Sequence, residues 1–145
     1  MKFLRINSFD TETRWGLVQE FLSEAGDSLE TFRYYFKRGA TVLDDHIYTV
    51  LLYNNDKIIG YGHLDPCDTG KIWLGICLVS GKTRMGLGKL IMKNLLAFAD
   101  QDKVKEIFLS VDIPNIGGKK LYEQFGFTVY NKSEKMYYMK RSRNV

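Results

Sequence analysis

One stretch, Trp73 to Asp100, limits the possible folds of this chain more than any other. It begins within an apolar run, Ile72 to Val79, passes through a polar loop that contains Gly81, Gly86 and Gly88, and continues with apolar residues at helical spacing. Those residues share one helix face and are Leu87, Leu90, Ile91, Leu95 and Phe98. The pattern predicts a strand, a glycine loop and a helix in direct succession.

This succession favours a bound anion. It brings the N–H groups of a loop and the partial positive charge of a helix N-terminus to one place. Lys82, Arg84 and Lys89 add positive charge at the same end. We therefore predict a phosphate-binding loop.

Two familiar nucleotide-binding motifs do not account for the loop. Gly81-Lys82-Thr83 matches the second half of a P-loop, but the first glycine of that motif would fall at Ile76. Gly86-Leu87-Gly88 lacks the third glycine of a dinucleotide-binding fold, and the alternating βαβ pattern of that fold is missing. A different phosphate ligand is therefore expected.

The length and composition are those of an ordinary globular domain. The chain has 145 residues, of which 45% are hydrophobic, so we expect one domain over residues 1–145. The net charge of +4 suits a small polyanion as well as nucleic acid. Because the sequence carries no motif of the common nucleic-acid-binding domains, we expect a small-molecule ligand and no nucleic acid.

Cysteine content and hydropathy indicate the compartment. Cys67 and Cys77 are too few for a disulfide framework, and no Cys-x-x-Cys spacing points to a metal site, so we expect no metal. The N-terminal segment lacks the apolar core of a secretory signal peptide, and no apolar window is long enough to span a membrane. We expect a reduced, cytoplasmic protein.

The chain as a whole follows the order β α α β β β α β α β β. Apolar and alternating runs predict strands at Lys2–Ile6, Ile47–Tyr53, Lys57–Leu64, 71–79, Glu106–Val111, Phe127–Tyr130 and Lys135–Met139. Helical spacing predicts helices at Glu12–Ala25, Asp27–Lys37, after Gly88, and at Asn115–Gln124. The strand at 71–79 lacks a polar face and is expected to be buried on both faces, while 140–143 is expected to be a frayed basic tail.

Two motifs and this order of elements resemble the GNAT superfamily of acetyl-CoA-dependent N-acetyltransferases. The first motif, Arg84-Met85-Gly86-Leu87-Gly88-Lys89, is close to the family signature Gln/Arg-x-x-Gly-x-Gly/Ala. The second, Asn115 to Phe127, resembles the family segment Asn-x-x-Ala-x-x-Leu-Tyr-x-x-x-Gly-Phe. The resemblance covers essentially the full chain. It implies a mixed α/β (α+β) GNAT fold, in which a central sheet of about six or seven strands is flanked by about four helices and splayed between the fourth and fifth strands.

The resemblance implies that an acetyl group passes from acetyl-CoA, the co-substrate, to an amine in a ternary complex. It assigns the pyrophosphate of coenzyme A to Thr83, Arg84, Met85, Gly86, Leu87, Gly88 and Lys89, although Thr83 stands where the family has Gln or Arg. N–H groups of the splayed strand, around Ile76, Cys77 and Leu78, would stabilise the developing oxyanion of the thioester carbonyl. Asn115 and Lys119 would contact the remainder of coenzyme A.

The resemblance also implies a general acid, and the residues leave the base open. Tyr122 matches the family's tyrosine and would protonate the leaving thiolate; a core tyrosine is the structural alternative. The family often places a basic carboxylate on the fourth strand, but Lys71-Ile72-Trp73-Leu74-Gly75 contains none. His63 and Asp65, at the end of the preceding strand, are the nearest substitutes, because histidine titrates near neutral pH. His46 is a weaker alternative.

Acceptor recognition is the least determined part of the prediction. Arg33, Tyr34, Arg38 and Trp73 are the candidates, because aromatic rings stack on a base or sugar and arginine binds phosphate. They would suit a nucleotide-linked amino sugar, although inward-packed rings on a helix explain most of them equally well. A protein or peptide N-acetyltransferase and a catalytically silent acyl-CoA-binding module remain alternatives. A homodimer is expected by fold-level analogy alone.

Overall fold

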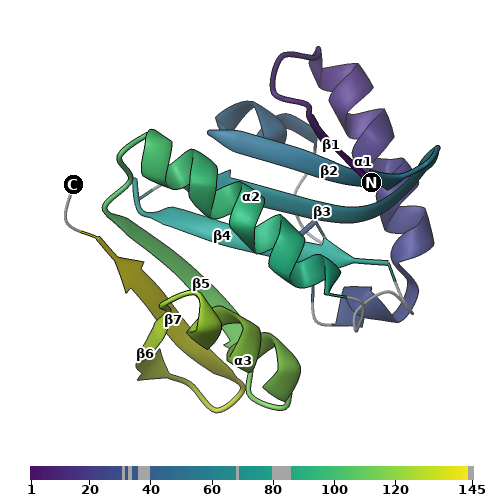
Figure 1. Cartoon of the computed structure of the whole chain (residues 1–145). Helices are drawn as coiled ribbons and strands as arrows, with labels where there is room; N and C mark the ends of the chain where they lie inside the picture. The colour runs from purple at the N-terminus through teal and green to yellow at the C-terminus, as the bar shows by residue number, and fades with distance from the viewer. Residues whose placement is uncertain (31, 33, 36–39, 68, 80–85, 144–145) are drawn as a thin grey trace.

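The computed structural model describes residues 1–30, 32, 34–35, 40–67, 69–79 and 86–143. Its seven strands form one sheet in the order β1-β2-β3-β4-β5-β7-β6 (Figure 1). The strands are β1 Lys2–Arg5, β2 Tyr48–Asn54, β3 Lys57–Asp65, β4 Ile72–Leu78, β5 Glu106–Asp112, β6 Thr128–Lys132 and β7 Met136–Ser142. The described helices are α1 Thr11–Ala25, α2 Leu87–Gln101, α3 Ile116–Gln124 and the 3-10 helices η1 Gly26–Glu30 and η2 Ala40–Asp45. The predicted mixed α/β fold is confirmed.

Helices α1 and α2 cover opposite faces of the sheet, and β3 lies between them. Phe21 of α1 stacks on Tyr61 with 5.8 Å between ring centroids. The next residue, Gly62, faces the other way and lies against Ile91 and Leu95 of α2. Successive side chains of a strand point to opposite faces, so β3 is buried on both. Figure 1 shows α2 lying across β3 and β4.

The β4 and β5 strands pair over a short distance and then part. Their parallel register joins Ile72 to Ile107 and Trp73 to Phe108, and no later pair of described residues continues it. The splay predicted between the fourth and fifth strands is confirmed. The expectation that strand 71–79 is buried on both faces was wrong, since Trp73 and Ile76 are only half-buried. The parting of the strands exposes them to a cleft.

The predicted helix from Asp27 to Lys37 was also wrong over its described part. The chain forms only the 3-10 helix η1, and Tyr34 and Tyr35 then lie in a turn. Both rings point inward, because Tyr34 bonds to Asp65 and Tyr35 bonds to Tyr61. Adjacent residues of an α-helix do not share a face, so these tertiary contacts exclude the helix that the spacing favoured.

The basic C-terminal segment is ordered, which corrects the expectation of a frayed tail. Strand β7 pairs with β5 through Ser142. Arg141 donates to both carboxylate oxygens of Asp100, at 3.1 and 3.2 Å, and Arg143 also pairs with that carboxylate. Burial acts to raise the pKa of Asp100, but the hydrogen bonds from Arg143 and Arg141 outweigh it and hold the pKa below its usual value.

None of the helices in the described part of the chain is long and apolar enough to cross a membrane.

Candidate active site

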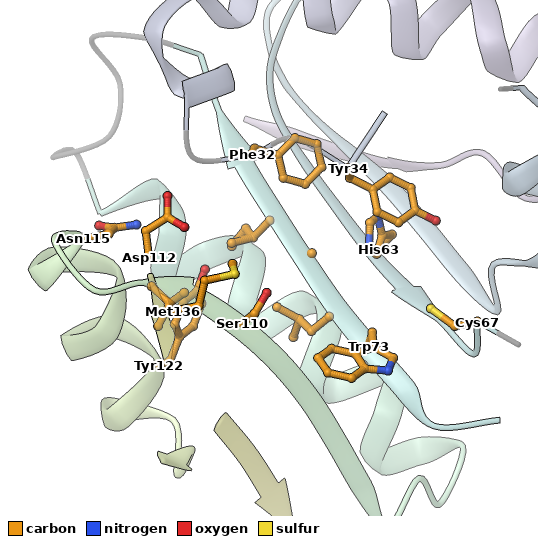
Figure 2. A pocket seen from close by; sticks show the side chains of 14 residues that line it. Phe32, Tyr34, His63, Cys67, Trp73, Ser110, Asp112, Asn115, Tyr122 and Met136 are labelled. Carbon is orange, nitrogen blue, oxygen red and sulfur yellow. The ribbon is translucent and has the colours of Figure 1, made fainter. Parts of the chain in front are cut away.

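The space between the parted strands is a cleft of about 490 Å³. This volume is within the range of roughly 300–1,000 Å³ that small-molecule sites occupy. Figure 2 shows side chains reaching it from both sides of β4, with Tyr34 and His63 on one side and Tyr122 and Asn115 on the other. The lining residues are Phe32, Tyr34, His63, Cys67, Trp73, Leu74, Gly75, Ile76, Ser110, Val111, Asp112, Asn115, Tyr122 and Met136.

The backbone of β4 contributes polar groups to the cleft. Val79 N donates to Ile59 O at 3.0 Å, which fixes the phase of the antiparallel ladder between β3 and β4. Hydrogen-bonded and non-hydrogen-bonded pairs alternate in such a ladder, so Gly75 and Cys77 turn their N–H groups to β3. The N–H groups of Ile76 and Leu78 are directed to the side where β5 has moved away. Of the three residues predicted to stabilise the oxyanion, Ile76 and Leu78 thus present N–H groups to the gap. The N–H group of Cys77 faces β3 instead, and burial raises the pKa of its thiol to about 12.

The helix that follows, α2, begins against the end of β4 and against α3, because Leu78 and Leu121 are the nearest neighbours of Gly88. Gly86 precedes α2 with a φ of 73°, in the left-handed region that favours glycine. Leu87 and Gly88 are buried in the first turn and Lys89 is exposed. Because glycine has no side chain to cap the helix, the N–H groups of this turn are suited to an anion. Thr83, Arg84 and Met85, the other predicted loop contacts, lie outside the described residues.

Helix α3 brings Tyr122 to the cleft. Asn115 caps this helix by accepting a hydrogen bond from Gly118 N at 3.0 Å, as its position in the sequence predicted. Lys119, one turn later, pairs with Glu123 at 3.2 Å. Burial, reinforced by the nearby Cys77, raises the pKa of Tyr122 well above its usual value. The Tyr122 hydroxyl therefore keeps its proton at neutral pH and can act as a donor.

His63 faces the cleft from β3, and Tyr61 and Gly75 contact its imidazole ring. Its Nδ1 lies 2.6 Å from the Tyr61 hydroxyl, which is itself 2.6 Å from the Tyr35 hydroxyl. On the other side, Nε2 lies over Gly75 of β4, where a Cβ atom would collide with the imidazole. Gly75 thus provides the space that the imidazole occupies.

Asp65 is buried at the end of β3 and is fully engaged by its neighbours. Oδ1 accepts from Cys67 N at 2.9 Å, and Oδ2 accepts from the Tyr34 hydroxyl at 2.6 Å. The Tyr34 oxygen also lies 2.7 Å from His46 Nε2. Asp65 is therefore connected to Tyr34 and His46 more closely than to the cleft, and it is not itself among the lining residues.

The structure brings most of the predicted site residues together and adds others. Tyr34 and Trp73 line the cleft as acceptor candidates, whereas Arg33 and Arg38 lie outside the described residues. The lining residues that sequence reasoning did not assign to the site are Phe32, Cys67, Leu74, Gly75, Ser110, Val111, Asp112 and Met136. For Ser110 and Asp112 a signal existed: they alternate with the buried Leu109 and Val111 along β5.

The parting of the parallel strands β4 and β5, with Tyr122 of α3 at the gap, is the arrangement that the sequence resemblance implied for an acyl-CoA-dependent N-acyltransferase. The model of the Acetyltransferase (GNAT) family matches residues 12–127, and the chain belongs to this family. It is therefore an acetyltransferase, an enzyme of the acyltransferase class. No curated protein matches the chain by sequence.

Solved structures of similar fold include several acetyltransferases. The chain is 17% identical to the PaiA N-acetyltransferase from Thermoplasma acidophilum in complex with coenzyme A, covering 99% of this chain and 100% of that one at a TM-score of 0.69. It is 19% identical to the Campylobacter jejuni N-acetyltransferase PseH, over 99% and 98% of the chains at a TM-score of 0.65. For the ribosomal-protein-S18-alanine N-acetyltransferase from Escherichia coli, identity is 15% over 97% and 92%, with a TM-score of 0.67. At these identities the likeness shows the shared fold.

Proposed function

We propose that this enzyme transfers the acetyl group of acetyl-CoA to the primary amine of a small molecule, by direct attack in a ternary complex. The observation that carries the proposal is the parting of β4 from β5 beside Tyr122, in a chain of the acetyltransferase family. Coenzyme A is bound in the PaiA structure, which supports the same donor here. We also propose that residues 1–145 act as a single catalytic domain.

The donor is assigned to the side of the cleft built from α2, α3 and β4. The first-turn N–H groups of α2, after Gly86, suit a pyrophosphate because they have no acceptor within the helix and lie at the positive end of the helix dipole. We assign the pyrophosphate contacts to Gly86, Leu87, Gly88 and Lys89, and we include Thr83, Arg84 and Met85 of the preceding loop in the same proposal. Asn115 and Lys119 are assigned to the rest of coenzyme A. The thioester supplies an acyl group with a good leaving group.

The N–H groups of β4 would stabilise charge on the acyl oxygen. Those of Ile76 and Leu78 are directed into the gap between the strands, whereas the predicted contribution of Cys77 is restricted to packing. Donors that are already oriented before the reaction stabilise a developing oxyanion at no cost of reorganisation.

Tyr122 is proposed as the general acid. Its hydroxyl keeps a proton at neutral pH, and the half-buried side chain lines the cleft opposite His63 (Figure 2). The amine nitrogen forms the new C–N bond as the C–S bond breaks, and the Tyr122 proton passes to the departing sulfur. The resulting phenolate, in a half-buried site where desolvation disfavours its charge, is reprotonated before the next cycle.

His63 is proposed as the base that takes the proton of the attacking amine. Its imidazole lies at the cleft and is held by Tyr61 and by the space over Gly75. Proton uptake at Nε2 requires Nδ1–H to donate to the Tyr61 oxygen, and the 2.6 Å contact permits this. Asp65, the other predicted candidate, already accepts from Tyr34 and Cys67, so we assign it a supporting part.

Among small amines, a nucleotide-linked amino sugar is the first acceptor to test. Phe32, Tyr34 and Trp73 contribute aromatic rings to the lining of the cleft. Aromatic faces stack on sugars and on planar bases. The predicted contribution of Arg33 and Arg38 to phosphate binding belongs to the same proposal.

The test is release of free thiol from acetyl-CoA in the presence of amino sugars, aminoglycosides, polyamines, amino acids and peptides. The proposal expects amine-dependent thiol release with a small-molecule acceptor and a product heavier by one acetyl group. Turnover with peptides alone would favour a protein N-acetyltransferase instead. Binding of acetyl-CoA without turnover of any acceptor would contradict the proposal and favour a silent acyl-CoA-binding module.

A further inference from the structure

A buried polar cluster behind the cleft wall holds the hydroxyl of Tyr34. This hydroxyl donates to Asp65 Oδ2 at 2.6 Å and lies 2.7 Å from His46 Nε2. Tyr34 is half-buried, whereas His46 and Asp65 are 5% and 2% exposed. Burying such groups is costly unless they are hydrogen-bonded, and here each bonds to the same phenol.

The direction of the hydrogen bonds follows from the chemistry of the three groups. Burial acts to raise the pKa of Asp65, but hydrogen bonds from Tyr34 and Cys67 and the charge of His46 hold it below its usual value. An ionised carboxylate only accepts, so the Tyr34 proton goes to Asp65. The phenol oxygen must then accept from His46 Nε2–H, while His46 Nδ1 lies 2.8 Å from Thr49 Oγ1.

The cluster ties together three segments that are distant in the chain. Tyr34 lies in the turn after η1, His46 lies between η2 and β2, and Asp65 ends β3. The Tyr34 ring forms part of the cleft wall and lies 4.3 Å from the His63 ring, centroid to centroid. Figure 2 shows Tyr34 and His63 together, on the side of β4 away from Tyr122.

We propose that His46 and Asp65 are positioning residues that clamp Tyr34, and that Tyr34 is a specificity-determining wall of the acceptor subsite. This inference rests on the proposed function, because it places the acceptor at the Tyr34 end of the cleft. A tyrosine in an irregular turn has no regular backbone ladder to fix it. Hydrogen bonds between its hydroxyl and the buried side chains of His46 and Asp65 contribute such a constraint, so the clamp sets the acceptor affinity and leaves the donor site untouched.

The kinetic test uses Tyr34→Phe, which removes the hydroxyl and keeps the ring. We expect the acceptor KM to rise about tenfold, while the acetyl-CoA Kd changes less than twofold. Tyr130→Phe, at an exposed tyrosine of β6, is the matched control and should change neither quantity. An unchanged acceptor KM in folded Tyr34→Phe would overturn the assignment of Tyr34.

A double-mutant cycle separates the clamp from ordinary core packing. His46→Leu removes the donor to Tyr34, and we expect it to raise the acceptor KM in the parent but to add less than twofold in the Tyr34→Phe background. His46→Gln, whose amide can replace the Nε2–H donor, should restore most of the loss. Equal effects of His46→Leu in both backgrounds, or no rescue by glutamine, would overturn the clamp.

A spectroscopic test does not depend on turnover. The chain contains two histidines, so nitrogen-15 NMR of the imidazole rings can be assigned with single His variants. We expect Nε2 of His46 to carry a proton throughout pH 6–9, and Tyr34→Phe to shift the His46 signals. A His46 tautomer protonated on Nδ1 alone would overturn the clamp. Absence of turnover with every amine would overturn the proposed function and the acceptor assignment, whereas NMR would still decide the clamp.

Discussion

The two sides of the cleft are built in different ways. The donor side consists of regular elements: β4, the start of α2 and the capped helix α3. The acceptor side is built largely from the irregular segment after α1, where the rings of Phe32, Tyr34 and Tyr35 pack against Tyr61 and His63 of β3. The donor side therefore rests on backbone groups of fixed geometry, while the acceptor side rests on side chains that hold one another.

This difference bears on what each side can recognise. Backbone N–H groups bind a pyrophosphate or an acyl oxygen whatever side chains surround them. A wall of rings and hydroxyls depends on each residue present, so one substitution changes its shape. We infer that the donor is fixed by the fold and the acceptor by the particular residues of the segment 26–67.

The largest effect is expected at the chemical step on the donor side. Tyr122→Phe should lower turnover by about 100-fold or more, since a general acid contributes roughly 10²–10⁴. The acetyl-CoA Kd should change less than threefold, as measured by calorimetric titration. Tyr130→Phe serves as the control because its ring lies on β6, outside the cleft. Unchanged turnover in a folded Tyr122→Phe variant would remove Tyr122 from the mechanism.

The second prediction tests the acceptor side through Gly75. In Gly75→Ala the added Cβ would collide with the His63 ring, and such overpacking costs about 1–3 kcal/mol. We expect the kcat/KM for the acceptor amine to fall tenfold or more. Gly16→Ala, at a position of α1 where no described residue has a heavy atom within 4 Å of the added Cβ, should stabilise the protein and leave the kinetics unchanged. Equal kinetics for Gly75→Ala and the parent would show that His63 needs no fixed position.

The third prediction separates backbone conformation from side-chain contact on the donor side. Gly86 has a φ of 73°, and among the described residues no heavy atom lies within 4 Å of an added Cβ. Gly86→Ala therefore introduces backbone strain of about 1–2 kcal/mol, without a clash against the described part of the chain. We expect acetyl-CoA binding to weaken several-fold while the acceptor KM holds. An unchanged acetyl-CoA Kd would indicate that the start of α2 does not bind the donor.

The smallest effect is expected away from both sides of the cleft, at the Asp100 carboxylate, which pairs with Arg141 and Arg143 of the C-terminal segment. The pKa of Asp100 is lowered in the folded protein, so its contribution to stability is present above the unfolded pKa and is lost as pH falls through the folded value. Asp100→Asn should lower the melting temperature by a few degrees at pH 7 and by less at pH 3. A larger loss at pH 3 than at pH 7 would contradict the sign of this linkage.

The regular elements were predictable from the sequence because local patterns determine them. The glycine loop, the apolar stripe of Leu87, Ile91 and Leu95, and the Asn115 cap lie within short windows, and the structure has the helices where these patterns put them. The parting of β4 from β5 was predicted from the family resemblance and not from a local pattern. Without it, the apolar run at 71–79 predicted a strand buried on both faces.

The acceptor side was less predictable because its contacts are long-range. Tyr34 reaches Asp65 across 31 positions of the chain, and Tyr35 reaches Tyr61 across 26. Those contacts displaced the helix that the spacing of Phe32 and Tyr35 favoured. His46 was underestimated for the same reason, since nothing near it in the sequence indicates a bond to Tyr34.

A crystal structure of the protein with coenzyme A tests the central claim most directly. The account predicts that the pantetheine arm lies between β4 and β5, with the phosphates at the start of α2 and the thiol sulfur within hydrogen-bonding reach of the Tyr122 hydroxyl. Coenzyme A bound away from this gap, or bound there with its sulfur remote from Tyr122, would contradict it.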